Sequence, residues 1–229
     1  MELKIRKFIF YIFWFLSLVI PFITVFRNSP INTIFSNEIV ALNVVQRISG
    51  LLLFTLISMQ IILGSNMDWW LQVFGSKAYR VHIVQGLFIY GLALFHPLME
   101  VSIVYKISES LLDALYVFVP SIKSTRDIYL IYGRSALIFL TIGVLASYFR
   151  TMPFLRKNWK VFHIINYLVF YAVYFHMRVG SDIMTWPFSW FSWVALTGVT
   201  ASVINKYILR NLFQKFKGSK NAEIVKQKA

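Results

Sequence analysis

The chain has 229 residues, of which 58% are hydrophobic and only 14% are charged. Soluble domains carry about 25% charged residues, so this composition argues against a soluble domain and indicates an integral membrane protein. The absence of cysteine excludes disulfides, thiolate ligation of haem and cysteine-ligated iron–sulfur clusters. The net charge of +14 does not indicate nucleic-acid binding, because most of the basic residues flank apolar segments, as the positive-inside rule predicts.

Apolar segments recur along the chain at lengths suited to a bilayer, whose hydrocarbon core of about 30 Å needs roughly 20 helical residues. The first follows a basic start and has no small-residue cleavage site, so we expect an uncleaved membrane span and not a signal peptide. The expected spans are roughly residues 8–26, 39–63, 81–104, 128–149, 161–177 and 188–209. The sequence therefore predicts an all-α fold, an integral membrane six-helix bundle.

The connections between the spans are short and mostly polar. We expect an amphipathic interfacial segment with two tryptophans at 64–80, a short interfacial helix at 110–119 ended by Pro120, and a tight basic loop at 150–160. Three regions follow: a first transmembrane helix and loop at 1–38, a membrane core at 39–209 and a basic cytoplasmic tail at 210–229. We expect the basic loop and tail to attract membrane lipid, with docking of an acidic flavoprotein as the alternative.

The distribution of Lys and Arg predicts the orientation. Six spans place both termini on one side, and most of the 23 basic residues fall on the side of the termini. The positive-inside rule then predicts a multi-pass protein of the plasma (inner) membrane with cytoplasmic N- and C-termini.

The four histidines of the chain fall in two of the predicted spans. His82 and His96 lie fourteen residues apart in the third span, and His163 and His176 lie thirteen apart in the fifth. Such spacings correspond to about 20 Å along a helix, which puts one histidine of each span near each leaflet. We expect His82 to pair with His163 and His96 with His176, as the axial ligands of two stacked bis-histidine haems.

Helical phase supports only part of this assignment. In an ideal helix His82 and His96 fall within about 40° of one face, but His163 and His176 point about 140° apart. A tilt of the fifth span, a local π or 3₁₀ turn, or different approaches to the two rings is then required. We expect Pro97 to bend the third span near His96. Histidines in membrane spans also serve in helix contacts and proton relays, so a non-redox transporter or scaffold is an alternative.

Two motifs carry a family resemblance. The segment Tyr79-Arg80-x-His82-x3-Gly86, followed by Leu94-x-His96-Pro97, and the segment Trp159-x3-His163-x2-Asn166-Tyr-Leu with His176 resemble the transmembrane domain of ferric reductases and NADPH oxidases. The resemblance covers about residues 39–209 and implies two b-type haems bound by the four histidines. The chain is also similar to the haem-binding membrane subunit of the methionine sulfoxide reductase system.

Four arginines are candidate partners for the anionic haem propionates. Arg80 and Arg178 lie two residues from His82 and His176, and Arg47 and Arg134 lie near the outer ends of their spans. Charge-assisted hydrogen bonds to carboxylates would suit each of them, and snorkelling is an equally good account of Arg80 and Arg178. Arg134 is also a candidate for holding an anionic ligand such as chelated iron.

The function that follows is electron transfer across the membrane from a cytoplasmic donor to an outer acceptor. About twenty residues follow the last span, and they hold no Gly-rich dinucleotide fingerprint, so we expect FAD or FMN only in a partner protein. The expected donor is a cytoplasmic flavoprotein or a quinol. The expected acceptor is a ferric chelate, with oxygen or a periplasmic redox protein as alternatives. An electron-transfer subunit that feeds a separate periplasmic reductase is the closest alternative, and whether the chain is an enzyme by itself stays open.

Overall fold

The computed structural model describes residues 3–209, and the predicted tail at 210–229 lies outside this part of the chain. The described residues form helices and connecting loops, with no strand among them. The long helices are α1 (Leu3–Asn28), α3 (Glu38–Ser65), α5 (Lys77–Ser108), α7 (Thr125–Tyr148), α8 (Pro153–His176) and α9 (Phe188–Ile204). The short elements are α2 (Ile31–Ile34), α4 (Met67–Phe74), α6 (Leu111–Tyr116), the 3₁₀ turns η1 (Met177–Val179) and η2 (Asp182–Met184), and the π-helical turn η3 (Asn205–Leu209).

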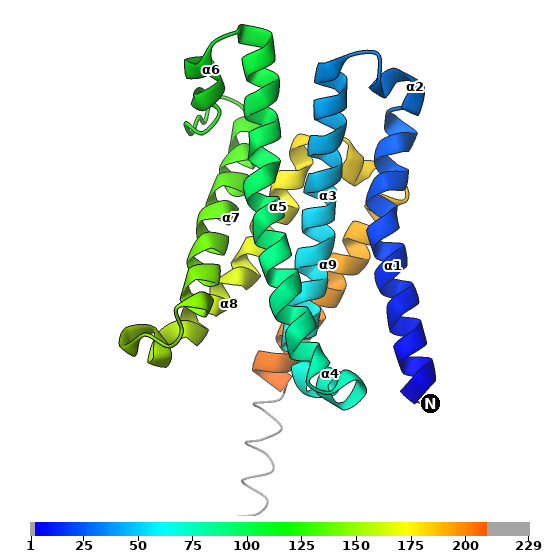
Figure 1. Ribbon diagram of the computed structural model, residues 1–229, viewed down its shortest axis with the longest axis vertical. Helices are drawn as coiled ribbons and strands as arrows, with labels where there is room; N and C mark the ends of the chain where they lie inside the picture. The colour runs from blue at the N-terminus through cyan, green and yellow to red at the C-terminus, as the bar shows by residue number, and fades with distance from the viewer. Residues whose placement is uncertain (1–2, 210–229) are drawn as a thin grey trace, which may run out of the picture.

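Four of the long helices, α1, α3, α5 and α7, are long and apolar enough to cross a membrane. Helix α9 has only 17 residues, and α8 carries several polar residues, so neither meets the same standard of length and composition. All six long helices run side by side in one bundle (Figure 1). Local sequence signals set their starts: the side chain of Asn37 caps α3, and Ser124 and Asp127 form a capping box at the start of α7.

Helix α3 forms the centre of the bundle. Of its most apolar 18 residues, 61% are buried, compared with 11% for the corresponding part of α5, which therefore lies at the periphery. Phe54 of α3 stacks on Phe170 of α8 with ring centres 5.3 Å apart, and it also contacts Phe188 of α9 at 6.0 Å. All three side chains are fully buried. Where these three rings meet, the core of the bundle is thus aromatic.

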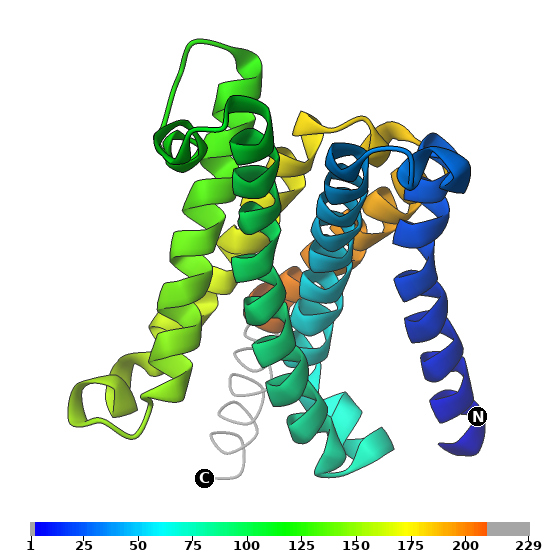
Figure 2. The same ribbon diagram turned by 45° about the horizontal axis from the view of Figure 1, so that its top comes forward.

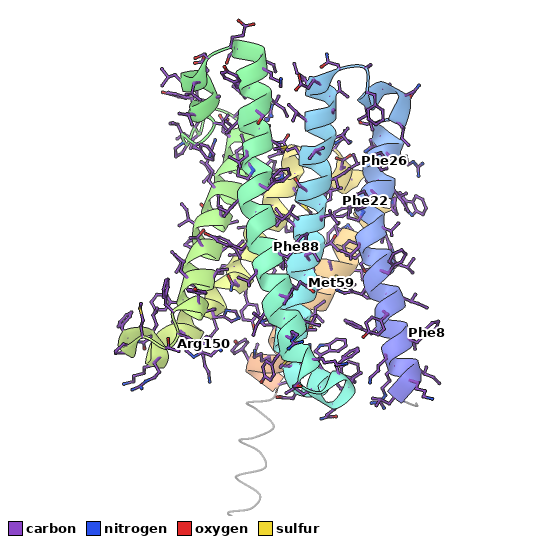
Figure 3. All side chains as sticks on the ribbon, in the orientation of Figure 1. Phe8, Phe22, Phe26, Met59, Phe88 and Arg150 are labelled. Atoms are coloured by element: carbon purple, nitrogen blue, oxygen red, sulfur yellow. The ribbon has the colours of Figure 1, made fainter. Side chains whose placement is uncertain are left out.

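The outer surface of the bundle is apolar. Phe8 on α1 and Phe88 on α5 are 65% and 59% exposed, and Figure 3 shows Phe8 projecting away from the bundle. An apolar exterior around a bundle of this composition is stable only in contact with lipid. The described chain is therefore a multi-pass membrane protein.

The two ends of the bundle differ in charge. The start of α1, the α4 segment, the α7–α8 connection and the end of α9 all lie at one end, while α2, α6 and the loop after α8 lie at the other (Figures 1 and 2). The first of these ends carries ten of the Lys and Arg residues in the described part: Lys4, Arg6, Lys7, Lys77, Arg80, Arg150, Arg156, Lys157, Lys160 and Lys206. We call it the basic end, and the other the outer end.

The basic loop expected at 150–160 is shorter than its sequence indicates. Helix α8 begins at Pro153, so only residues 149–152 connect it to α7. Proline suits this position because the first helical residues have no intrahelical partner for their N–H groups. The lysines and arginines that follow Pro153 therefore extend the helix beyond its apolar part.

The helices that carry the histidines belong to different close-packed pairs. Helix α5 packs mainly on α3, and α8 packs mainly on α7. In the part of the chain that the structure describes, α5 and α8 do not themselves form a closely packed pair. Helix α8 remains α-helical from Pro153 to His176, without the π or 3₁₀ turn considered for it, and the 3₁₀ turn begins only at Met177. Figures 1 and 2 show α8 inclined relative to α5.

Candidate site: two pairs of histidines

The structure brings the four histidines together in the two pairs expected from their depths. His82 of α5 faces His163 of α8 near the basic end, with ring centres 6.1 Å apart and an angle of 70° between the ring planes. His96 faces His176 near the outer end, with ring centres 6.2 Å apart and an angle of 87°. We call these the inner and the outer pair.

The spacing within each pair suits one metal ion held between the rings. Two imidazole nitrogens bound about 2 Å from one ion on opposite sides place the ring centres roughly 6 Å apart. Among the described residues, no group of three or more His, Cys, Asp or Glu side chains could hold a metal ion. A metal held by only two protein side chains would take its other ligands from water, a substrate or a cofactor, and a haem bound through two histidines is one such arrangement.

Hydrogen bonds fix the orientation of the outer pair. Nδ1 of His96 lies 3.0 Å from Oγ of Ser49, whose own proton goes to Gln46, and 3.1 Å from the carbonyl oxygen of Gln46. Nδ1 of His176 lies 3.0 Å from the carbonyl oxygen of Tyr129. A carbonyl oxygen only accepts, so Nδ1 of each ring carries the proton and Nε2 keeps a free lone pair. This tautomer leaves Nε2 of each ring able to bind a metal.

The inner pair is held asymmetrically. Nδ1 of His163 lies 2.9 Å from Oγ of Ser147, and that hydroxyl donates its own proton to the carbonyl oxygen of Gly143 at 2.8 Å. The Ser147 oxygen therefore accepts from Nδ1 of His163. Nδ1 of His82 is shielded from solvent and has no hydrogen-bond partner among the described residues. Gln60 donates to the backbone carbonyl oxygen of His82, not to its ring.

Glycines on neighbouring helices make room for three of the rings. A Cβ atom at Gly50 or Gly64 of α3 would lie 2.9 Å from His96 or 3.0 Å from His82, respectively. A Cβ atom at Gly133 of α7 would lie 2.5 Å from Nδ1 of His176, which is shorter than any tolerated contact. The absence of side chains at these positions lets α3 and α7 back the histidines directly.

The four candidate arginines differ in their surroundings. Arg134 of α7 donates through Nε and Nη2 to the carbonyl oxygen of Val117, while its buried Nη1 has no partner in the described part of the chain. Arg47 of α3 forms a bidentate ion pair with the buried Asp182, which the sequence analysis did not anticipate. Arg178 lies over the rings of Tyr174 and Phe175, and Arg80 is exposed at the start of α5.

Lys206 is a further charged group that sequence reasoning missed. Its Nζ donates to the carbonyl oxygen of Gly64, the residue that backs His82, at 3.3 Å. A lysine at the edge of an apolar span is a weak signal by itself, because snorkelling explains most of them. Ser147 and the carbonyl groups of Gln46 and Tyr129 gave no sequence signal, because their role depends on how the helices pack.

Buried polar atoms without partners collect around the histidines. Besides those of His82 and Arg134, they include Oε1 of Gln60, whose Nε2 donates to the backbone of His82, and Oδ1 of Asn166, whose side chain neighbours His163. The remaining such atom in the described part of the chain is Nε1 of Trp70. Unpaired buried polar groups are costly and rare in folded proteins. Their concentration at these sites fits a bound group with polar atoms of its own.

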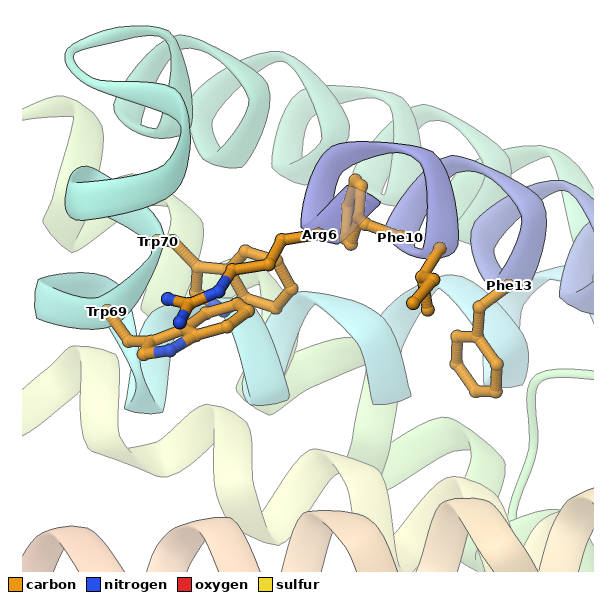
Figure 4. Close-up of a pocket in the computed structure, with 6 residues that line it drawn as sticks. Arg6, Phe10, Phe13, Trp69 and Trp70 are labelled. Carbon is orange, nitrogen blue, oxygen red and sulfur yellow. The ribbon is translucent and has the colours of Figure 1, made fainter. Parts of the chain in front are cut away.

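One hollow lies apart from the histidines. It has a volume of about 220 Å³ and is lined by residues of α1 and α4 at the basic end. Its lining is almost entirely apolar, and no histidine contributes to it. Figure 4 shows the six lining residues: Arg6, Ile9, Phe10, Phe13, Trp69 and Trp70.

The fold is that of a helical membrane protein with two histidine pairs between its helices. A sequence model of the family "Ferric reductase like transmembrane component" matches residues 49–175, more than half of the chain. The chain therefore belongs to the ferric reductase-like transmembrane family. The match includes His82, His96 and His163 and stops one residue before His176. Searches among curated proteins and solved structures found no match.

Proposed function

We propose that the protein carries electrons across the membrane through two b-type haems, one between each histidine pair. The observation that carries this proposal is the separation of 6.1 and 6.2 Å between paired rings, which fits a single metal ion at each level. Membership of the ferric reductase-like family supports the same assignment. Haem, when bound, supplies one-electron redox chemistry that the side chains of this protein lack.

The residues of the chain prepare each level for that cofactor. The carbonyl groups of Gln46 and Tyr129 and the hydroxyl of Ser147 hold protons on Nδ1 and leave Nε2 of the opposing rings free to ligate. With one histidine on each side of the cofactor, the two rings would hold the metal and would leave substrates no place to bind it. The acceptor then needs only to approach the outer level closely enough to receive an electron.

The core between the two levels keeps water away from the path. Phe170 lies on α8 between His163 and His176, and it is fully buried against Phe54 of α3. Such a dry aromatic layer shields the space between two redox centres from protons and water. Its role in this proposal is insulation and packing, and electron hopping through the rings is not required.

We infer the direction from charge. The basic end faces the cytoplasm, because Lys and Arg accumulate on the cytoplasmic side of plasma (inner) membrane proteins. This orientation requires that all six long helices cross the bilayer. A cytoplasmic flavoprotein or a quinol then donates electrons to the inner level, and an acceptor on the opposite side receives them from the outer level.

A ferric chelate is the acceptor that the outer end suits best. Arg134 and Arg178 contribute positive charge there, which favours an anionic chelate, and the buried Nη1 of Arg134 would suit a carboxylate of a bound haem. In the reaction each Fe³⁺ takes one electron and becomes Fe²⁺. The name of the family also favours iron over oxygen as the acceptor.

Sealed vesicles test this function directly. The purified protein is inserted into vesicles that contain a ferric chelate and an Fe²⁺ indicator, and a reductant that cannot cross the bilayer is added outside. We expect indicator colour inside vesicles with the wild-type protein, and no colour above background with His96→Ala or His176→Ala. Gly91→Ala is the matched control, because a Cβ at this position of α5 meets no atom within 4 Å. Equal rates for the histidine variants and this control would refute the proposal.

A further inference from the structure

The Nδ1 atoms of the four histidines are not equally supported. Those of His96 and His176 face backbone carbonyl oxygens, and that of His163 faces the hydroxyl of Ser147. Nδ1 of His82 alone is buried without a partner in the region that the structure describes. In the inner pair, Nδ1 of His163 therefore has a hydrogen-bond partner and Nδ1 of His82 has none among the described residues. We call a ring with such a partner supported and a ring without one unsupported.

Support at Nδ1 governs how firmly an imidazole holds a metal. A hydrogen bond from Nδ1–H fixes the tautomer and the orientation of the ring and raises the basicity of Nε2. Loss of such a partner typically weakens metal binding 10- to 100-fold. His82 has neither its tautomer nor its ring orientation fixed in this way, so it is the weakest of the four candidate ligands.

Packing around His82 does not replace the missing hydrogen bond. Gly64 of α3 backs the ring closely, since an added Cβ would lie 3.0 Å from Cε1, but glycine offers Nδ1 no side-chain acceptor. Gln60 bonds to the backbone of His82 and so secures the helix but not the imidazole. By contrast, the ring of His163 also contacts Trp159, with centres 5.8 Å apart.

Resting on the haem assignment of the proposed function, we propose that His82 is an exchangeable ligand and that the inner level binds a small neutral molecule in its place. The chemical class is a compact ligand with one lone pair for iron, such as carbon monoxide or free imidazole. The outer level, with two supported rings, stays closed to such ligands. The inner level would then be a second, ligand-responsive site within an electron-transfer protein.

Carbon monoxide tests the asymmetry in the intact protein. The wild-type protein in detergent is reduced, titrated with carbon monoxide and followed by its absorption spectrum. We expect half of the haem to form the carbon monoxide complex, and the same half to disappear in His163→Gly. A wild-type protein whose haem is complete but does not bind carbon monoxide would overturn the inference and leave the proposed function intact. A protein without haem would overturn both.

Removal of each inner ligand gives a second readout. We expect His82→Gly to keep haem at the inner level, with a high-spin spectrum that returns to low spin when imidazole is added. We expect His163→Gly to lose the inner haem, so that its haem content falls by about half. Equal haem contents in the two variants, with equal responses to imidazole, would contradict the assignment of His82 as the weaker ligand.

A designed partner for His82 supplies the converse test. The Cβ of a residue at position 64 would lie 3.6 Å from Nδ1 of His82, so Gly64→Ser brings a hydroxyl within reach of this atom. Gly64→Ala imposes the same Cβ on the ring without the hydroxyl and is the matched control. We expect Gly64→Ser to bind carbon monoxide about tenfold more weakly than Gly64→Ala. Equal affinities in the two variants would contradict the proposed role of the missing hydrogen bond.

Discussion

At the scale of single residues, the candidate site depends on small groups behind the histidines. A carbonyl or hydroxyl oxygen decides which ring nitrogen carries the proton, and a missing side chain decides whether the ring fits at all. The hydroxyl of Ser147 and the bare backbone of Gly133 are the two clearest cases. Both lie on α7, which therefore supports both ligands of α8.

Removing the hydroxyl of Ser147 tests whether this group supports His163 as a ligand. Ser147→Ala deprives Nδ1 of His163 of its acceptor, so we expect haem affinity at the inner level to fall at least tenfold. Haem titration of the apoprotein measures this change. Ser102→Ala is the control, because the half-buried Ser102 of α5 also donates to the carbonyl oxygen four residues earlier, in an exposed hydrogen bond. Equal affinities for the two variants would show that the Ser147 hydroxyl does not support the ligand.

Adding a methyl group at position 133 tests whether the bare backbone of Gly133 is needed for the ring of His176. Gly133→Ala places a Cβ 2.5 Å from Nδ1 of His176, so the ring must leave its position and we expect loss of the outer haem. Gly91→Ala adds the same methyl group to a helix where nothing lies within 4 Å, and we expect it to keep both haems. Haem content per chain, measured by absorption, would be equal in the two variants if Gly133 served only ordinary packing.

At the scale of elements, a buried ion pair joins three separate segments at the outer end. Asp182 of η2 accepts hydrogen bonds from Arg47 of α3 and from Asn28 of α1, with distances of 2.6 Å. Arg47 neighbours Gln46, whose carbonyl oxygen faces His96, and η2 follows the turn after His176. The ion pair therefore ties together the segments that carry and support the outer pair.

Breaking this buried ion pair should lower the free energy of unfolding far more than breaking an exposed ion pair. In Asp182→Asn the Arg47 guanidinium loses its carboxylate while largely buried, so we expect the free energy of unfolding to fall by about 3 kcal/mol. Lys106→Gln breaks the exposed pair with Glu38 and should cost less than about 1 kcal/mol. Unfolding of both variants in detergent, followed by circular dichroism, measures the difference. Similar small losses in both would show that the buried pair does not hold the outer end together.

At the scale of the whole molecule, much of the arrangement could be predicted from apolar segment lengths and histidine spacing. All six expected spans coincide with long helices, and the histidines meet in the expected pairs because equal depth follows directly from residue counts. The 140° phase difference in α8 did not prevent pairing: both of its histidine rings meet those of α5, and the helix is inclined relative to α5.

Features that depend on packing between distant segments could not be predicted. Arg47 was expected to meet a haem propionate, but its partner Asp182 lies 135 residues away in a 3₁₀ turn that has no sequence signature. The same limit applies to Ser147, whose hydroxyl matters only because α7 packs against α8. The basic loop at 150–160 was misplaced because lysines and arginines form helices as readily as loops.

The haem-to-protein ratio of the purified wild-type protein tests the central claim most directly. The pyridine haemochrome spectrum gives the amount of b-type haem, and amino-acid analysis gives the amount of protein. We expect two haems per chain, and one per chain in His96→Ala. A colourless protein, or a ratio that does not change in His96→Ala, would contradict the assignment of the histidine pairs as haem ligands.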